Sequence, residues 1–279
     1  MRFGLSTFLF HDERLRRDHL TDLAARGFEA IEVFATRTHF DYHDASAVDA
    51  LADWLAETGL RLHSVHAPIA ESYAGGVWGT ALSIAAADRE HRGRAISEAE
   101  AALAVARTIP FDFLVVHVGT PEEYAAGTQD NSAEAARRSV GELHGAASRL
   151  GVRLALEVIP NRLSSVEALR RLLDEDLELR DAGLCLDFGH AHLMDDVVSV
   201  VEEASGHMVT THVHDNHGRR DDHLVPFDGN IDWNHVLFAA QKIGYDGVYV
   251  FELASSGSTG DVLDRAGRAC RRFEEIVTA

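Results

Sequence analysis

The sequence predicts a single closed (β/α)8 barrel over residues 1–279, with its active site at the C-terminal mouth of the strands. Short apolar runs alternate along the whole chain with longer stretches rich in Ala, Leu, Arg and Glu at helical spacing. Eight such strand-then-helix units fit within 279 residues without a proline-rich or low-complexity linker. That number of units and that length are typical of this barrel.

The elements follow one another in order. The expected strands are residues 3–7, 30–34, 60–66, 113–118, 153–159, 183–188, 209–215 and 247–253. The expected helices are residues 15–26, 46–58, 88–108, 132–150, 164–175, 191–205, 233–243 and 260–277. Gly59 and Gly151 suit the left-handed residue that ends a helix, and Ser132 and Asp232 suit helix N-caps. A doubly wound open sheet is the competing fold, but the first run lacks the glycine loop that usually follows its first strand.

Composition and charge exclude several classes of protein. With 26 Lys+Arg against 45 Asp+Glu, the net charge of −19 argues against a nucleic-acid coat or a membrane-surface binder. No apolar run approaches the roughly 20 residues of a spanning helix, and the first residues lack a signal-peptide cleavage site. Cys185 and Cys270 form no paired motif. We expect a cytoplasmic protein without nucleic-acid or membrane partners, and a homo-oligomer is left open.

Histidine and acidic residues gather where the expected strands end. They are His66, His117, Glu157, Asp187, His212, His214 and Glu252. The C-terminal strand ends of such a barrel converge on one mouth. Burying these groups together is costly unless a cation neutralises the carboxylates, so the pattern predicts a metal site. Imidazole and carboxylate donors without thiolates favour Zn, Mn, Co, Fe or Mg.

Further candidates lie just beyond the strands. His190 follows Asp187 in the segment DFGH, and Asp221 and His223 lie in the polar loop RRDDHLVPFDGNIDW, for which a solvated loop is the alternative. His212 and His214 share one face of their strand, so that one suits a metal ligand and the other a substrate contact. Spacing alone does not rank the two histidines.

Several motifs together resemble the xylose-isomerase-like TIM-barrel superfamily. They are HSVHAP (63–68), HVG (117–119), LALEV (154–158), CLDFGHAH (185–192), HVHDN (212–216), DDHLVPFDGNIDW (221–233) and FEL (251–253). The superfamily contains sugar isomerases and epimerases, inosose dehydratases, hydroxypyruvate isomerases and endonuclease IV-type abasic-site nucleases. The resemblance covers nearly the whole chain in order, but it does not specify the substrate.

The resemblance implies a role for each matching residue. The metal of the sugar-acting members would be held by Glu157, Asp187, His212 and Glu252, which ranks His212 above His214. Glu157 and Glu252 would also be the acid and base, and His190 would contact the substrate. The endonuclease-like members hold three zinc ions with additional residues. The matching positions here are His66, His117, His190, Asp221 and His223, so one to three ions of Zn, Mn, Co or Mg are expected.

The function that we expect is isomerisation or epimerisation of a sugar, sugar phosphate or keto-polyol in carbohydrate metabolism. Proton transfer by the glutamates would pass through a metal-stabilised enediolate. The expected substrate contacts are His214, Arg219, Trp78, Phe8 and Glu32. The alternatives are an inosose-dehydratase-like lyase and a multinuclear-zinc phosphodiesterase or AP endonuclease. The segment HAPIAESYAGG lacks the bulky wedge residues of the nuclease, which favours sugar chemistry.

Overall fold

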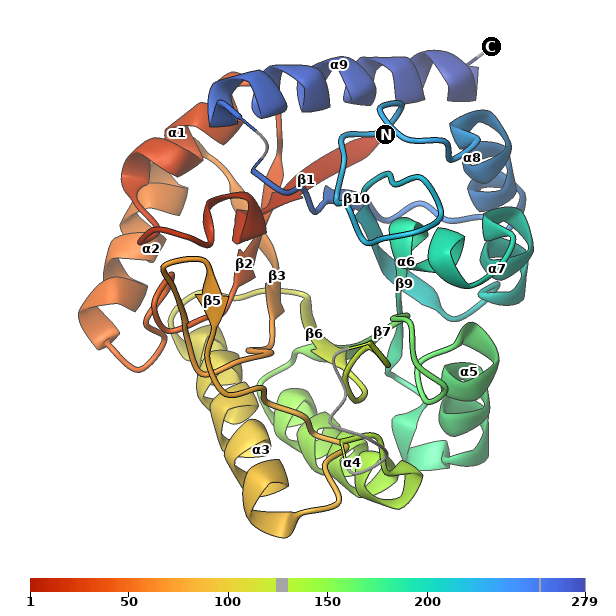
Figure 1. The fold of residues 1–279 in the computed structure, drawn as a ribbon. Coiled ribbons are helices and arrows are strands. Elements are labelled where there is room, and N and C mark those ends of the chain that lie inside the picture. The colour runs from red at the N-terminus through yellow and green to blue at the C-terminus, as the bar shows by residue number, and fades with distance from the viewer. Residues whose placement is uncertain (124–129, 256, 279) are drawn as a thin grey trace.

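The computed structural model describes residues 1–123, 130–255 and 257–278, and these residues form a closed barrel of strands inside a ring of helices (Figure 1). The barrel strands lie in the order β1-β10-β9-β8-β7-β6-β3-β2. Every neighbouring pair is parallel. The (β/α)8 fold expected from the sequence is confirmed.

The barrel strands agree closely with the expected runs. Their bounds are β1 (Arg2–Ser6), β2 (Ala30–Phe34), β3 (Arg61–His66), β6 (Phe113–His117), β7 (Arg153–Glu157), β8 (Gly183–Asp187), β9 (Met208–Val213) and β10 (Val248–Phe251). Between β3 and the next helix, β4 (Tyr73–Ala74) and β5 (Val77–Trp78) form a separate antiparallel pair. His214 and Glu252 therefore lie just past their strands.

Helices surround the barrel on all sides in Figure 1. Their bounds are α1 (Arg17–Ala25), α2 (Ala45–Thr58), α3 (Arg89–Leu103), α4 (Ala133–Arg149), α5 (Val166–Glu175), α6 (Phe188–Met194), α7 (Val197–Glu203), α8 (Trp233–Lys242) and α9 (Thr259–Thr278). Short 3-10 helices span Thr7–Phe10, Ala104–Arg107 and Leu177–Leu179. No helix among the described residues is long and apolar enough to cross a membrane.

The helix ends show why these segments start and stop where they do. Gly59 ends α2 with a φ of 73°, and the Ser132 side chain accepts a hydrogen bond from the backbone N–H of Ala135 at the start of α4. The single helix expected over 191–205 is wrong, because the backbone is extended at Asp195. Asp196 then caps a new helix by accepting from the N–H of Ser199. Short Asp side chains compete with helical hydrogen bonding in this way.

Strand register brings the acidic and histidine residues to one level of the barrel. His117 on β6 lies opposite Glu157 on β7, and Asp187 on β8 lies opposite His212 on β9. The register between β2 and β3 shifts by one residue, so His63 is an extra residue on β3. Such a bulge re-aims the side chains that follow it. The apolar residues on the outer faces of the strands pack under the helices as one core.

Candidate metal centre

The strand ends at the C-terminal mouth bring four potential ligands together. Glu157, Asp187, His212 and Glu252 each offer a ligand atom within 4.8 Å of the others, and all four side chains are buried; we call them the inner group. The Nδ1 atom of His212 faces the carboxylates, at 3.2 Å from Glu157 Oε1, 3.5 Å from Glu252 Oε2 and 3.8 Å from Asp187 Oδ2. One imidazole and three carboxylates form a donor set suited to a divalent cation.

A second set of ligands shares Glu157 with the inner group. His66, His117 and Glu157 form the side group, in which the Nε2 atoms of His66 and His117 lie 3.0 and 3.1 Å from Glu157 Oε2. His66 also groups with His212 and Glu252. Because one oxygen of Glu157 faces each set, this carboxylate lies where it could bridge two ions.

A third set lies at the outer rim of the mouth. His190, His214, Asp221 and His223 form the outer group. The Nε2 atoms of His190 and His223 lie 3.0 and 3.1 Å from Asp221 Oδ2. His214 stacks on His223 with 4.0 Å between ring centroids, and its Nε2 lies 2.9 Å from Asp187 Oδ1. His214 therefore connects the outer group to the inner group.

Local structure holds the outer group in place. Asp215 is buried and accepts hydrogen bonds from the N–H groups of Phe227 and Ile231 and from the indole of Trp233, which fixes the loop that carries Asp221 and His223. His223 and Phe227 adopt positive φ angles of 45° and 78° in this loop, and such strained residues cluster at functional sites.

Gly189 in the segment DFGH makes room for His214. A Cβ atom at Gly189 would lie only 2.0 Å from Cε1 of the His214 ring. Any residue with a side chain would therefore push His214 out of its position between Asp187 and His223. The sequence interpretation did not single out Gly189 or Asp215, although both lie inside the quoted motifs.

The second nitrogen of several histidines is already occupied. The Nδ1 of His66 donates to the carbonyl of Ala67 at 2.8 Å, and the Nδ1 of His223 donates to the carbonyl of Glu252 at 2.9 Å. Each of these bonds fixes the tautomer in which Nε2 carries the lone pair. In both residues that Nε2 faces the ligand groups, as a metal ligand requires.

Buried polar atoms without partners mark the space where a cation fits. Among the described residues, these atoms in the mouth lack a hydrogen-bond partner: Glu157 Oε1, His190 Nδ1, His212 Nδ1, His214 Nδ1 and Asp221 Oδ1. Buried polar atoms are otherwise almost always paired. Glu157 Oε1 and His212 Nδ1 lie 3.2 Å apart without hydrogen-bond geometry, which is the arrangement expected of two ligands that aim at one ion.

The histidines and carboxylates of the mouth strongly shift one another's pKa values. Burial lowers the pKa of His66, but Glu157, Glu32 and Glu252 together raise it, and the net value is about 9. Burial also lowers the pKa of His223, and Asp221 raises it to about 9. Burial raises the pKa of Glu157, yet His117 and His212 hold it well below its usual range. Without metal, protonated histidines therefore balance the charge of the carboxylates, and a metal that binds these histidines must displace their protons.

The remaining candidates occupy different depths of the mouth. Trp78 is partly exposed and stacks on His11, with 5.4 Å between ring centroids. Phe8 also stacks on the ring of His11, with 4.5 Å between centroids. Arg219 is exposed on the loop after β9. Glu32, expected to contact substrate, is instead fully buried below His212. Both of its oxygens lie 3.1 Å from Nε2 of His212, and the hydroxyl of Ser64 donates to one of them.

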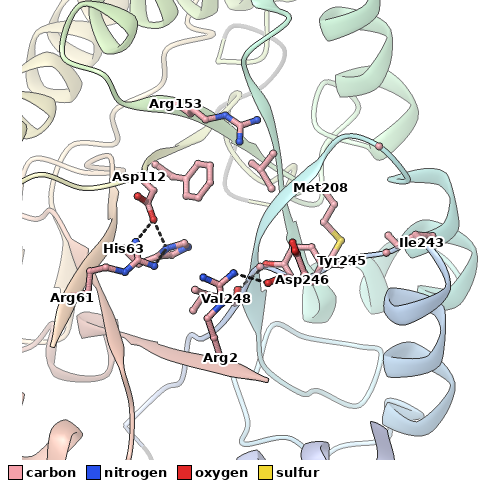
Figure 2. A pocket seen from close by; sticks show the side chains of 15 residues that line it. Arg2, Arg61, His63, Asp112, Arg153, Met208, Ile243, Tyr245, Asp246 and Val248 are labelled. Carbon is pink, nitrogen blue, oxygen red and sulfur yellow. Dashed lines mark hydrogen bonds and ion pairs between the residues drawn. The ribbon is translucent and has the colours of Figure 1, made fainter. Parts of the chain in front are cut away.

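A cavity of about 400 Å³ lies at the opposite end of the barrel, lined by residues that begin the strands (Figure 2). Arg61 and His63 both pair with Asp112, and Arg2 donates to the carbonyl of Asp246. Arg153 lies over the ring of Phe113 and donates to the carbonyl of Asp181. The four basic side chains Arg2, Arg61, His63 and Arg153 of this cavity are thus already engaged with the protein.

Comparison with known proteins shows the family to which the chain belongs. A family model described as xylose isomerase-like TIM barrel matches residues 20–275. Uncharacterized protein MJ1311 of Methanocaldococcus jannaschii is 27% identical over 263 residues, which cover 90% of this chain and 83% of that protein.

Solved structures share the whole architecture. The crystal structure of a D-tagatose 3-epimerase-like protein superposes with a TM-score of 0.81 at 23% identity, covering 100% of this chain and 98% of that one. The structure of IOLI protein with a bound zinc atom superposes with a TM-score of 0.75 at 18% identity, also covering 100% and 98%. At these identities the likeness shows a common fold.

Proposed function

Because the chain belongs to the xylose isomerase-like TIM-barrel family, we propose that it is a metal-dependent isomerase or epimerase of a sugar, sugar phosphate or keto-polyol. The observation that carries the proposal is the convergence of Glu157 and Glu252 on one buried cation-binding group from non-adjacent strands. The same fold in a D-tagatose 3-epimerase-like protein supports the sugar class.

The inner group would hold the divalent ion, which when bound supplies a Lewis acid for the carbonyl and neighbouring hydroxyl of the substrate. Glu157 Oε1 and Glu252 Oε2 lie 3.2 and 3.5 Å from His212 Nδ1. One glutamate removes the α-proton and the other returns a proton to the resulting enediolate. His190 or His214 donates a hydrogen bond to the developing oxyanion.

The most direct test is exchange of the α-proton of keto-sugars with deuterated solvent, followed by NMR in the presence of Zn²⁺, Mn²⁺, Co²⁺ or Mg²⁺. We expect exchange with the wild type and its loss in Glu157→Gln and Glu252→Gln. Glu203→Gln, an exposed glutamate at the end of α7, is the matched control and should exchange normally. Loss of a β-hydroxyl during the same reaction would identify the inosose-dehydratase-like lyase, which begins with the same proton abstraction.

A second function is favoured by one specific observation. The side and outer groups supply ligands beyond the inner group. Glu32, Glu157, Asp187, Asp221 and Glu252 also carry more negative charge than one divalent ion neutralises. Two or three zinc ions would suit a phosphodiesterase, in which they clamp a phosphate and generate hydroxide. Hydrolysis of a generic phosphodiester or of an abasic-site duplex by the zinc-loaded protein, without deuterium exchange into sugars, would favour this function.

A further inference from the structure

Glu32 on β2 is a buried carboxylate that the reaction proposed above does not use. Its side chain has no exposed surface. The Nε2 of His212 lies 3.1 Å from both of its oxygens, and the hydroxyl of Ser64 donates to Oε2 at 2.8 Å. The Glu32 carboxylate therefore pairs with the ring of His212. This ring separates Glu32 from the three carboxylates of the inner group.

A local irregularity of the barrel places Glu32 and Ser64 together. Ile31 pairs with Leu62 in register, but Glu32 pairs with Ser64, because His63 is an extra residue on β3. The bulge allows His63 to reach Thr210 across the barrel at 3.0 Å while Ser64 reaches Glu32. In a regular strand the register would not bring the Ser64 hydroxyl to this carboxylate.

His212 uses its two nitrogens in the reverse sense from its neighbours. His66 and His223 donate through Nδ1 to backbone carbonyls and present Nε2 to the ligand groups. His212 has Nε2 against Glu32 and presents Nδ1 to Glu157, Asp187 and Glu252. A carboxylate partner raises the basicity of a ligating imidazole more than a neutral carbonyl does.

We propose that Glu32 is the positioning residue of the metal centre: it accepts the Nε2–H of His212 and so fixes the tautomer and ring orientation in which Nδ1 is the ligand. The inference rests on the proposed metal dependence. It replaces the substrate contact expected for Glu32 from the sequence. Ser64 supports it by holding the carboxylate with one hydroxyl.

The test compares metal affinity with the stability of the metal-free protein. We would measure the dissociation constants of Zn²⁺ and Co²⁺ by chelator competition, the visible absorption spectrum of the Co²⁺ protein, and the melting temperature after metal removal. For Glu32→Gln we expect about 10- to 100-fold weaker metal binding, the range typical of lost outer-shell partners, with an altered Co²⁺ spectrum. The melting temperature of the metal-free variant should fall only modestly, because Glu157 and Glu252 still lie beside the His212 ring after the charge of Glu32 is removed.

Two further variants complete the design. Glu32→Asp keeps the negative charge and should recover part of the metal affinity. Ser64→Ala should weaken metal binding less than Glu32→Gln. If Glu32→Gln does not fold, these two variants test the inference in its place. His63→Gln, on the same bulge but bonded to Thr210, is the control and should leave metal affinity unchanged.

The outcomes separate the inference from the proposed function. Metal affinity within twofold of the wild type in Glu32→Gln would overturn the inference, as would a loss of affinity matched by an equal loss of metal-free stability. Weaker binding with an altered Co²⁺ spectrum supports it even if no sugar exchanges deuterium, in which case only the proposed reaction fails. A wild type that binds neither metal overturns both.

Discussion

The two ends of the barrel both contain charged side chains, but they differ in how completely those side chains are paired. At the N-terminal end, both ring nitrogens of His63 are engaged: Nδ1 lies 3.2 Å from Asp112 (Figure 2), and Nε2 lies 3.0 Å from the hydroxyl of Thr210. At the C-terminal mouth, Glu157 Oε1 and His212 Nδ1 face each other without a hydrogen bond. None of the described side chains lining the N-terminal cavity has a buried polar atom without a partner.

Cavity size alone does not locate the candidate functional site of this barrel. The N-terminal end has a cavity of about 400 Å³, yet Arg61 and His63 pair there with Asp112, and Arg2 and Arg153 donate to backbone carbonyls. Residues at this end of such barrels commonly serve stability. At the mouth, by contrast, buried donor atoms of the described residues lack partners within the protein and are available to a bound ion.

The largest effect is expected from Glu157→Gln, because this carboxylate belongs to both the inner and the side group. Metal binding should weaken by more than ~100-fold, beyond the usual effect of an outer-shell change, and proton exchange should be lost. Elemental mass spectrometry after dialysis measures the metal. Retention of full metal content by this variant would show that Glu157 is not a metal ligand.

Metal removal should make stability depend on pH at the mouth. The pKa values of His66 and His223 are raised from 6.5 to about 9 in the metal-free protein. A raised histidine pKa contributes stability that is fully present below pH 6.5 and is lost as the pH rises through 9. For His66 alone the loss between these pH values is about 2 to 3 kcal/mol, at about 1.4 kcal/mol per pKa unit.

Calorimetry of chelated and metal-loaded protein at both pH values checks this expectation. The loaded protein should lose less stability over the same window, because a cation in the inner group disfavours the protonated form of the neighbouring histidines. Asp112 at the N-terminal end should not contribute to the change between pH 6.5 and 9. Its pKa is lowered to about 2, mainly by the hydrogen bond with His63, so its contribution to stability is lost only as the pH falls toward 2. An equal fall in chelated and loaded protein would contradict the assignment.

A smaller effect is expected from Asp112→Asn at the N-terminal end. The Asp112 side chain is 45% exposed, so solvent screens its pairs with Arg61 and His63. Chemical denaturation should show a loss of about 1 kcal/mol or less, and metal affinity should stay at the wild-type value. A change in metal affinity would show that the two ends are coupled.

The smallest effect is expected at the rim of the mouth. Trp78→Ala removes a ring that stacks on His11 but touches no ligand group. Steady-state kinetics should show KM raised about 2- to 10-fold, the equivalent of one aromatic contact, with metal affinity unchanged. Leu177→Ala, an exposed apolar residue before β8, serves as the control. An unchanged KM would place substrate away from this rim.

The sequence predicted the fold and much of the mouth because both follow from strand periodicity. Glu157, Asp187 and His212 lie at strand ends in a pattern that a barrel necessarily brings together. The pairing of Glu32 with His212 could not be predicted, because it depends on the bulge at His63, which leaves no mark in the alternation of apolar residues. The backbone break at Asp195 was missed because helical spacing continues through it.

The positions of Asp221 and His223 needed the structure for a different reason. Their loop is arranged by Asp215 through contacts with Phe227, Ile231 and Trp233. A sequence pattern shows a polar loop there but not its path back over the mouth.

The most direct test of the metal centre is a crystal of the zinc-loaded protein with anomalous scattering recorded at the zinc absorption edge. A zinc ion in the inner group should give a peak about 2.0 to 2.2 Å from the ligand atoms of Glu157, Asp187, His212 and Glu252, with Glu32 still against Nε2 of His212. A mouth without a peak, or a peak only in the cavity beside Arg61 and Asp112, would contradict it.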